Sequence, residues 1–193
     1  MSSDRAADSY LIYASLLPFG EAANPDWPHG MWLIQDATVP VVPLDEPCKP
    51  KTSARPRHHG SMNPHVAVHP PPSRVQDFNE ILADFDVHCH DRVSLSATAW
   101  QTTVPVHLLT SDERTEFEDS RSEKADESAK AKYRGASGLY GFSEVYFNDR
   151  HTVALVYATH WCGGLCGEGF WFAFVLDDGR WKQQQWATTH WIS

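Results

Sequence analysis

The main candidate reactive residues of this 193-residue chain lie in one short segment of its C-terminal third. Cys162 and Cys166 lie in the string Cys-Gly-Gly-Leu-Cys-Gly-Glu-Gly, which has four glycines in eight residues. Because glycine tolerates positive φ and tight turns, the two cysteines can bring their Cα atoms within the about 4.4–6.8 Å that a disulfide needs. We expect a disulfide that holds the shape of this loop. Reduced structural thiols, or a metal or redox role, are the alternatives.

Two further groups could take part in catalysis at the same loop. His160 lies just before it and Glu168 within it, so a Cys–His or Glu–His pair could transfer a proton. No spacing here is diagnostic of an enzyme, and such histidines are more often structural residues of a sheet. The sequence therefore favours a non-enzymatic protein. A small hydrolase-like or thiol redox enzyme, centred on His160, Glu168 and the two cysteines, is the alternative.

A zinc-stabilised domain is a third interpretation. His88, Cys89 and His90 follow a predicted helix, and His160 lies beside the glycine-rich loop. Zinc takes Cys and His ligands in tetrahedral sets. However, the Cys-x3-Cys spacing differs from the usual Cys-x2-Cys knuckle. The sequence therefore predicts neither a metal nor another cofactor.

The chain is rich in tryptophan, with eight residues of this type. Five of them follow residue 160, namely Trp161, Trp171, Trp181, Trp186 and Trp191. Large rings on one small sheet either fill a core or line a groove, and core packing is the commoner outcome. If they line a groove, Trp161, Trp171 and Trp186 are the candidate binding residues.

Composition excludes several classes of protein. The formal net charge of −9 argues against a general binder of nucleic acid or anionic membranes. The longest apolar run, 170–176, is far shorter than the ~20 residues of a membrane span. The first residues lack the basic and apolar regions of a signal peptide, so we expect a cytoplasmic protein whose partner is another protein or a small ligand.

Proline and hydrophobic spacing predict the elements that position the loop. All 13 prolines lie before residue 106, which leaves the C-terminal third free to form long strands. Apolar residues at helical spacing predict helices at 8–17 and 75–87. Alternating apolar residues predict strands at 142–147, 152–160, 170–176 and 181–186, joined as an antiparallel meander. Shorter strands are predicted at 31–39, 93–99 and 104–109.

Two polar stretches interrupt this pattern. The stretch 46–75 is rich in proline, histidine and basic residues, which predicts a long exposed loop. A charged stretch near 111–134 predicts a short helix and then a mobile segment. We therefore expect one α+β domain over 1–193, with a meander of four or more strands packed through one face against two N-terminal helices. This order of elements is compatible with a cystatin-like or NTF2-like cone.

Several strings of the chain carry a family resemblance. They are Ser-Glu-Val-Tyr-Phe-Asn at 143–148, Ala-Leu-Val-Tyr at 154–157, the loop at 162–169, Gly-Arg-Trp-Lys at 179–182 and Trp-Ile-Ser at 191–193. With the opening helix and the strand at 32–38, they resemble a bacterial protein family without an established activity. The resemblance implies a shape more than a chemistry. Because members of that family look exported, it implies an exported protein as the alternative to a cytoplasmic one.

These observations together predict a non-enzymatic binding or interaction module. It would use the loop at 162–169 and the aromatic residues near it.

Overall fold

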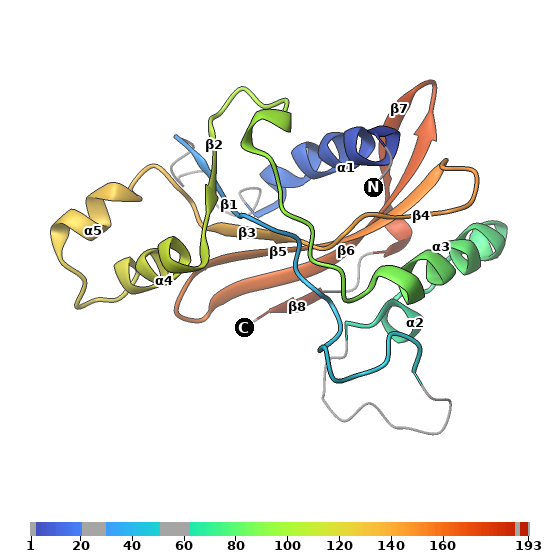
Figure 1. Ribbon diagram of the computed structural model, residues 1–193, viewed down its shortest axis with the longest axis horizontal. Coiled ribbons are helices and arrows are strands. Elements are labelled where there is room, and N and C mark those ends of the chain that lie inside the picture. Colours follow the sequence, from blue (N-terminus) through green and yellow to red (C-terminus); the bar gives the residue numbers. More distant parts are fainter. Residues whose placement is uncertain (1–2, 21–29, 51–61, 188–189, 193) are drawn as a thin grey trace.

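The computed structural model describes residues 3–20, 30–50, 62–187 and 190–192 (Figure 1). The helices are α1 (Ser3–Leu16), α2 (Pro64–Ala67), α3 (Val75–His88), α4 (Ser111–Ser120) and α5 (Glu127–Lys132). The 3-10 turns are η1 (Leu17–Gly20), η2 (Pro72–Arg74), η3 (Ala97–Ala99) and η4 (Gln185–Ala187). The strands are β1 (Trp32–Gln35), β2 (Val106–Leu109), β3 (Leu139–Phe142), β4 (Tyr146–Phe147), β5 (Val153–Gly163), β6 (Cys166–Asp177), β7 (Arg180–Gln184) and β8 (His190–Ile192).

The described strands form one mixed sheet of eight strands. Its main order is β2-β1-β3-β5-β6-β7, while β4 pairs with β5 and β8 pairs with β6. β1 runs parallel to both β2 and β3, and the strands from β3 onward pair antiparallel. The predicted α+β class and the C-terminal antiparallel meander are therefore confirmed. The parallel N-terminal edge was not predicted.

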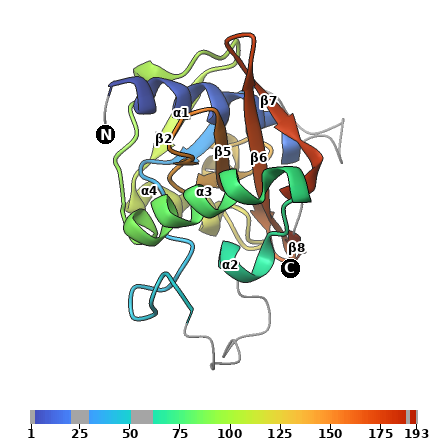
Figure 2. The ribbon, with the colours of Figure 1, turned by 90° about the vertical axis from the view of Figure 1, so that its right-hand side faces the viewer.

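The two N-terminal helices lie on opposite faces of the sheet (Figures 1 and 2). The residues of α1 that pack on the sheet, such as Ile12 and Leu16, share a cluster with Val156 of β5. The residues of α3, such as Phe85, share another with Leu155 of β5. The prediction that both helices pack against one face was wrong. Successive side chains of a strand point to opposite faces, and β5 is apolar on both faces, so each face requires its own cover.

A third cluster lies beside the parallel edge of the sheet. It contains Leu33, Leu109, Phe117, Tyr133, Ala136 and Leu139. A capping box formed by Thr110 and Glu113 begins α4. The charged stretch after α4 contains the short helix α5, which the sequence did not predict. Tyr133, 3% exposed, packs edge-on against Phe117 at 5.2 Å and secures this segment to the core.

The proline-rich stretch 46–75 is more structured than a loop in its described parts. It contains α2 and η2, and Val68 is 2% exposed. Its first part is bonded to the end of α3 through Cys48 and Cys89. Residues 51–61, with His58 and His59, lie outside the described residues.

Candidate functional site

The glycine-rich segment forms the end of the longest hairpin of the sheet. β5 and β6 pair from Val153 and Val175 to Trp161 and Gly167, and a bulge then precedes the last pair. Cys162 and Cys166 form a disulfide with a Cα–Cα distance of 5.2 Å. We call residues 162–166 the hairpin tip.

Two glycines permit the turn of the hairpin tip. Gly163 and Gly164 have φ values of 114° and 52°, a region that favours glycine. Gly164 and Leu165 are the two residues between the last pair, Gly163 and Cys166. A positive φ at Gly164 but not at Leu165 matches the type II′ turn, which has glycine at its first central position.

The hairpin tip is braced from one side and open on the other. A Cβ added to Gly163 would lie 3.1 Å from Cβ of Arg121, so the two backbones lie close together. The guanidinium of Arg121 donates to the carbonyl oxygen of Ala136 at 2.7 Å and lies 4.8 Å from the ring of Phe117. In contrast, Leu165 is 89% exposed. The tip therefore presents an apolar side chain from a braced turn.

His160 lies inside the hairpin, away from the surface. It is 1% exposed, and its ring lies 4.6 Å from that of Tyr140. Burial, with a smaller contribution from Arg121, lowers the pKa of His160 to about 4, so the imidazole is neutral at pH 7. A Cβ added to Gly138 would overlap this ring. The packing leaves His160 in a structural position.

Glu168, the second catalytic candidate, faces His160 across the β5–β6 ladder. Its Oε1 lies 4.0 Å from Nδ1 of His160, and its side chain is 25% exposed. The pair therefore has one accessible member and one buried member. A shallow apolar depression of about 280 Å³ lies elsewhere, between α1 and η3, and is lined by Ala6, Ala7, Tyr10, Leu11, Ala99 and Gln101.

The three candidate binding tryptophans belong to two different clusters. Trp171 is 0% exposed, and its Nε1 donates to the carbonyl oxygen of Met62 at 2.7 Å. Trp186 packs edge-on against Phe78 at 6.1 Å, in the same cluster as Trp171. Trp161 belongs to the third cluster. The structure therefore does not gather these rings into one groove, and Trp161 is the one next to the hairpin tip.

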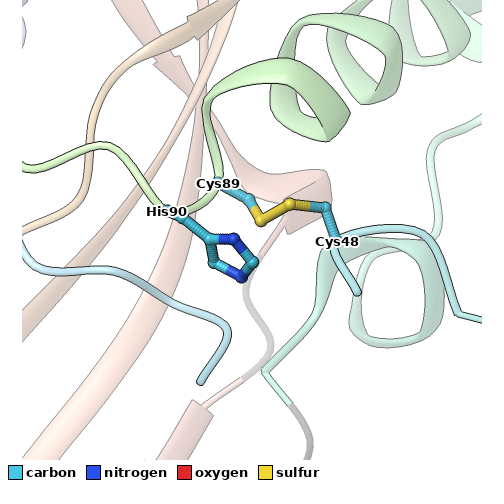
Figure 3. Close-up of side chains that lie close together, drawn as sticks. All are labelled: Cys48, Cys89 and His90. Carbon is cyan, nitrogen blue, oxygen red and sulfur yellow. A yellow bond between two sulfur atoms is a disulfide. The ribbon is translucent and has the colours of Figure 1, made fainter. Parts of the chain in front are cut away.

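A second cysteine site was missed from the sequence. Cys48 and Cys89 form a disulfide with a Cα–Cα distance of 5.9 Å. One imidazole nitrogen of His90 and the two Sγ atoms all lie within 4.8 Å of one another (Figure 3). The signal was present, because a pair at 162 and 166 leaves only these two cysteines for a second bond.

A partly buried charge cluster joins α1, α3 and the segment before β4. Arg5 donates to both carboxylate oxygens of Asp84 at 2.9 and 2.8 Å and to the carbonyl oxygen of Val145 at 2.8 Å. Glu144 is 5% exposed and lies 3.6 Å from Arg5. Burial raises the pKa of Glu144. Buried charges of this kind are held by their partners, and we interpret the cluster as a connection between the helices on opposite faces.

Comparison of the chain with protein families, curated proteins and solved structures found no match. The resemblance to a bacterial family and the analogy with a cystatin-like or NTF2-like cone therefore stay predictions. No helix within the described residues combines the length and the apolar character needed to cross a membrane. The fold and the site define a disulfide-linked α+β protein with a mixed sheet and a braced hairpin tip.

Proposed function

We propose that this protein is a non-enzymatic interaction module that binds a protein partner through its hairpin tip. The observation that carries the proposal is Leu165, which is 89% exposed on a turn closed by a disulfide. Exposed apolar side chains are common one at a time. This one differs because its backbone is held by the ladder, the Cys162–Cys166 bond and Arg121 together.

A fixed tip favours binding for a physical reason. Ordering a flexible loop upon association costs free energy, and a loop that is already ordered avoids that cost. An apolar side chain at the centre of a contact can then contribute strongly when it enters a pocket of the partner. We infer a protein partner that offers a small apolar pocket to Leu165.

The position of His160 supports a binding function over catalysis. A general base must come within about 2.6–3.2 Å of the proton that it removes, and His160 is 1% exposed. Glu168 is accessible, and its Oε1 lies 4.0 Å from Nδ1 of this buried ring. The enzyme alternative would need the hairpin to open.

The disulfides support export to an oxidising compartment. All four cysteines of the chain are paired, and disulfides persist mainly outside the cytosol. This favours the exported alternative over the cytoplasmic one. It also makes a permanently closed hairpin tip physically reasonable.

Selection from a phage-displayed peptide library on the oxidised protein tests the proposal. We expect enriched peptides whose affinity falls at least tenfold for Leu165→Asp, because a charge then replaces the apolar contact. Val87→Asp is the matched control, since Val87 is 72% exposed on α3. The double variant Cys162→Ser/Cys166→Ser should weaken binding severalfold because it frees the tip.

Two results would contradict the proposal. One is the enrichment of peptides that bind the wild type and Leu165→Asp equally. The other is a selection that yields no peptide preferring the protein over an unrelated protein of similar charge.

A further inference from the structure

Three side chains with metal-ligand atoms meet at the C-terminal end of α3. The Sγ atoms of Cys48 and Cys89 and a nitrogen of His90 lie within 4.8 Å of one another. Figure 3 shows the imidazole beside the disulfide, with Cys89 and His90 on one segment and Cys48 on another. Cys89 is 0% exposed, whereas Cys48 and His90 are partly buried.

Reduction would turn this group into a set of metal ligands. In the oxidised protein, the two sulfurs are bonded to each other and carry no charge. Two electrons and two protons convert the bond into two thiols, and each thiol loses its proton when it binds a metal. Two thiolates and one imidazole are ligands that zinc accepts readily.

The spacing of the group suits zinc. With Zn–S bonds of about 2.3 Å and a Zn–N bond of about 2.0–2.1 Å, the ligand atoms of a tetrahedral site are roughly 3.5–3.8 Å apart. The Cα atoms of Cys48 and Cys89 are 5.9 Å apart, so side-chain rotation alone can separate the sulfurs to this distance. A nitrogen of His90 lies within 4.8 Å of both sulfurs.

Contacts that do not involve the disulfide hold the residues in place. Cys89 follows the last residue of α3 in helical conformation, with φ −61° and ψ −20°. On the other segment, Nδ2 of Asn63 donates to the carbonyl oxygen of Cys48 at 2.7 Å, and Asn63 itself caps α2. The two thiols would therefore stay close together after reduction.

The two neighbouring histidines differ in their partners. Nδ1 of His88 lies 2.7 Å from Asp91, and Nε2 of His88 lies 3.6 Å from Asp84. In contrast, Nε2 of His90 is buried and has no hydrogen-bond partner among the described residues. A buried nitrogen without a partner is one sign of a place where a water or an ion belongs. His90, which has a nitrogen within 4.8 Å of both sulfurs, is thus the histidine available to them.

The geometry points to a redox-gated zinc site formed by Cys48, Cys89 and His90. A dithiol reductant gives two electrons and two protons to the disulfide and closes to its own cyclic disulfide, so that Cys48 and Cys89 become thiols. Zn²⁺ then displaces both thiol protons, which pass to solvent, and binds the two thiolates and His90. Water or an added ligand takes the fourth position. This site goes beyond the proposed function and does not depend on it.

Metal titration of the full chain tests the site. The Cys162→Ser/Cys166→Ser background keeps one disulfide, so each thiol that appears on reduction comes from Cys48 or Cys89. The protein is reduced with dithiothreitol, freed of reductant without oxygen, and titrated with Co²⁺ as a coloured substitute for Zn²⁺. We expect one equivalent of Co²⁺ with a thiolate-to-cobalt absorption band, which Zn²⁺ then removes. The oxidised protein should show no such band.

Histidine variants separate this site from a simple thiol pair. His90→Ala should weaken Co²⁺ and Zn²⁺ binding at least tenfold, because it removes one of three protein ligands. His88→Ala is the matched control and should leave the affinity unchanged. Undiminished affinity in His90→Ala would overturn the proposal. So would an absence of metal binding by the reduced protein.

Circular dichroism covers the case in which reduction unfolds the chain. Zinc should then restore the spectrum of the oxidised protein in the Cys162→Ser/Cys166→Ser background but not when His90→Ala is added. A reduced chain that zinc fails to refold would also overturn the proposal.

Discussion

The two disulfides of this protein have different structural roles. Cys48 and Cys89 are 41 residues apart and connect the proline-rich stretch to the end of α3, whereas Cys162 and Cys166 are four residues apart on strands that already pair. Closing a long loop removes much entropy from the unfolded chain, and closing a short loop removes less. The first bond therefore stabilises the fold as a whole, and the second sets a local shape.

The surroundings of the two disulfides differ as well. Cys89 is fully buried and has a histidine beside it. The second bond lies at an exposed tip beside Leu165. Reduction of the first would therefore affect folding and metal binding, and reduction of the second would affect recognition of a partner.

The largest effect that we expect comes from removing the long-range bond. Cys48→Ala/Cys89→Ala should lower the free energy of unfolding by about 4 kcal/mol, and Cys162→Ala/Cys166→Ala by about 2 kcal/mol, as loop-closure entropy predicts. Urea denaturation followed by tryptophan fluorescence measures both. A larger loss of stability in Cys162→Ala/Cys166→Ala than in Cys48→Ala/Cys89→Ala would contradict this prediction.

The hairpin region should also carry a pH dependence through His160. Its pKa of about 4 in the folded protein is below the ordinary value of about 6.5, so the unfolded chain takes up the proton first. The free energy of unfolding therefore decreases by up to about 3 kcal/mol as the pH falls from 6.5 to 4.

Urea denaturation at several pH values checks this effect. His160→Gln should flatten the fall in stability between pH 6.5 and pH 4. His69→Gln changes an exposed residue of the proline-rich stretch and serves as the control, with the slope of the wild type. An unchanged slope in His160→Gln would show that the buried ring does not govern this region.

The regular parts of the fold were predictable because their patterns are strong. The helix predicted at 75–87 is α3, and the strands predicted at 152–160 and 170–176 correspond to the first part of β5 and the second part of β6. Of the strand predicted at 142–147, Phe142 is the last residue of β3 and the last two residues form β4. The polar pair Ser143 and Glu144 lies between β3 and β4, where Ser143 donates to the carbonyl oxygen of Glu144.

Long-range pairing was not predictable from local patterns. The parallel ladders of β1 with β2 and β3 join segments about 70 to 105 residues apart, and the register of such segments depends on how the whole core packs. The candidate site also depends on contacts between segments that are distant in the sequence. The spacing of Cys162 and Cys166 suggested a local bond, but nothing local indicated that His90 would lie beside Cys48.

Trp171 gives a second way to weaken the attachment of the proline-rich stretch. Its buried Nε1 donates to the carbonyl oxygen of Met62, so Trp171→Phe leaves that oxygen without its donor and opens a cavity. We expect a loss of about 2 kcal/mol in the free energy of unfolding. Trp161→Phe is the matched change near the hairpin tip, where the ring is partly exposed, and should cost less than about 1 kcal/mol. Equal losses would mean that Trp171 holds the stretch no better than a surface ring.

Substitutions of the two glycines of the hairpin tip test how tightly the tip is braced. Gly163→Ala forces a side chain into a positive φ of 114° and within 3.1 Å of Cβ of Arg121, whereas Gly164→Ala, at φ 52°, meets no atom within 4 Å. An unfavourable φ alone costs roughly 1 kcal/mol, so Gly164→Ala should lose about that much. Gly163→Ala should lose more, because the neighbouring backbone must also move. Thermal denaturation of the two variants gives the difference. If the two losses are equal, Arg121 does not brace the tip, and the disulfide and the ladder alone hold Leu165 in place.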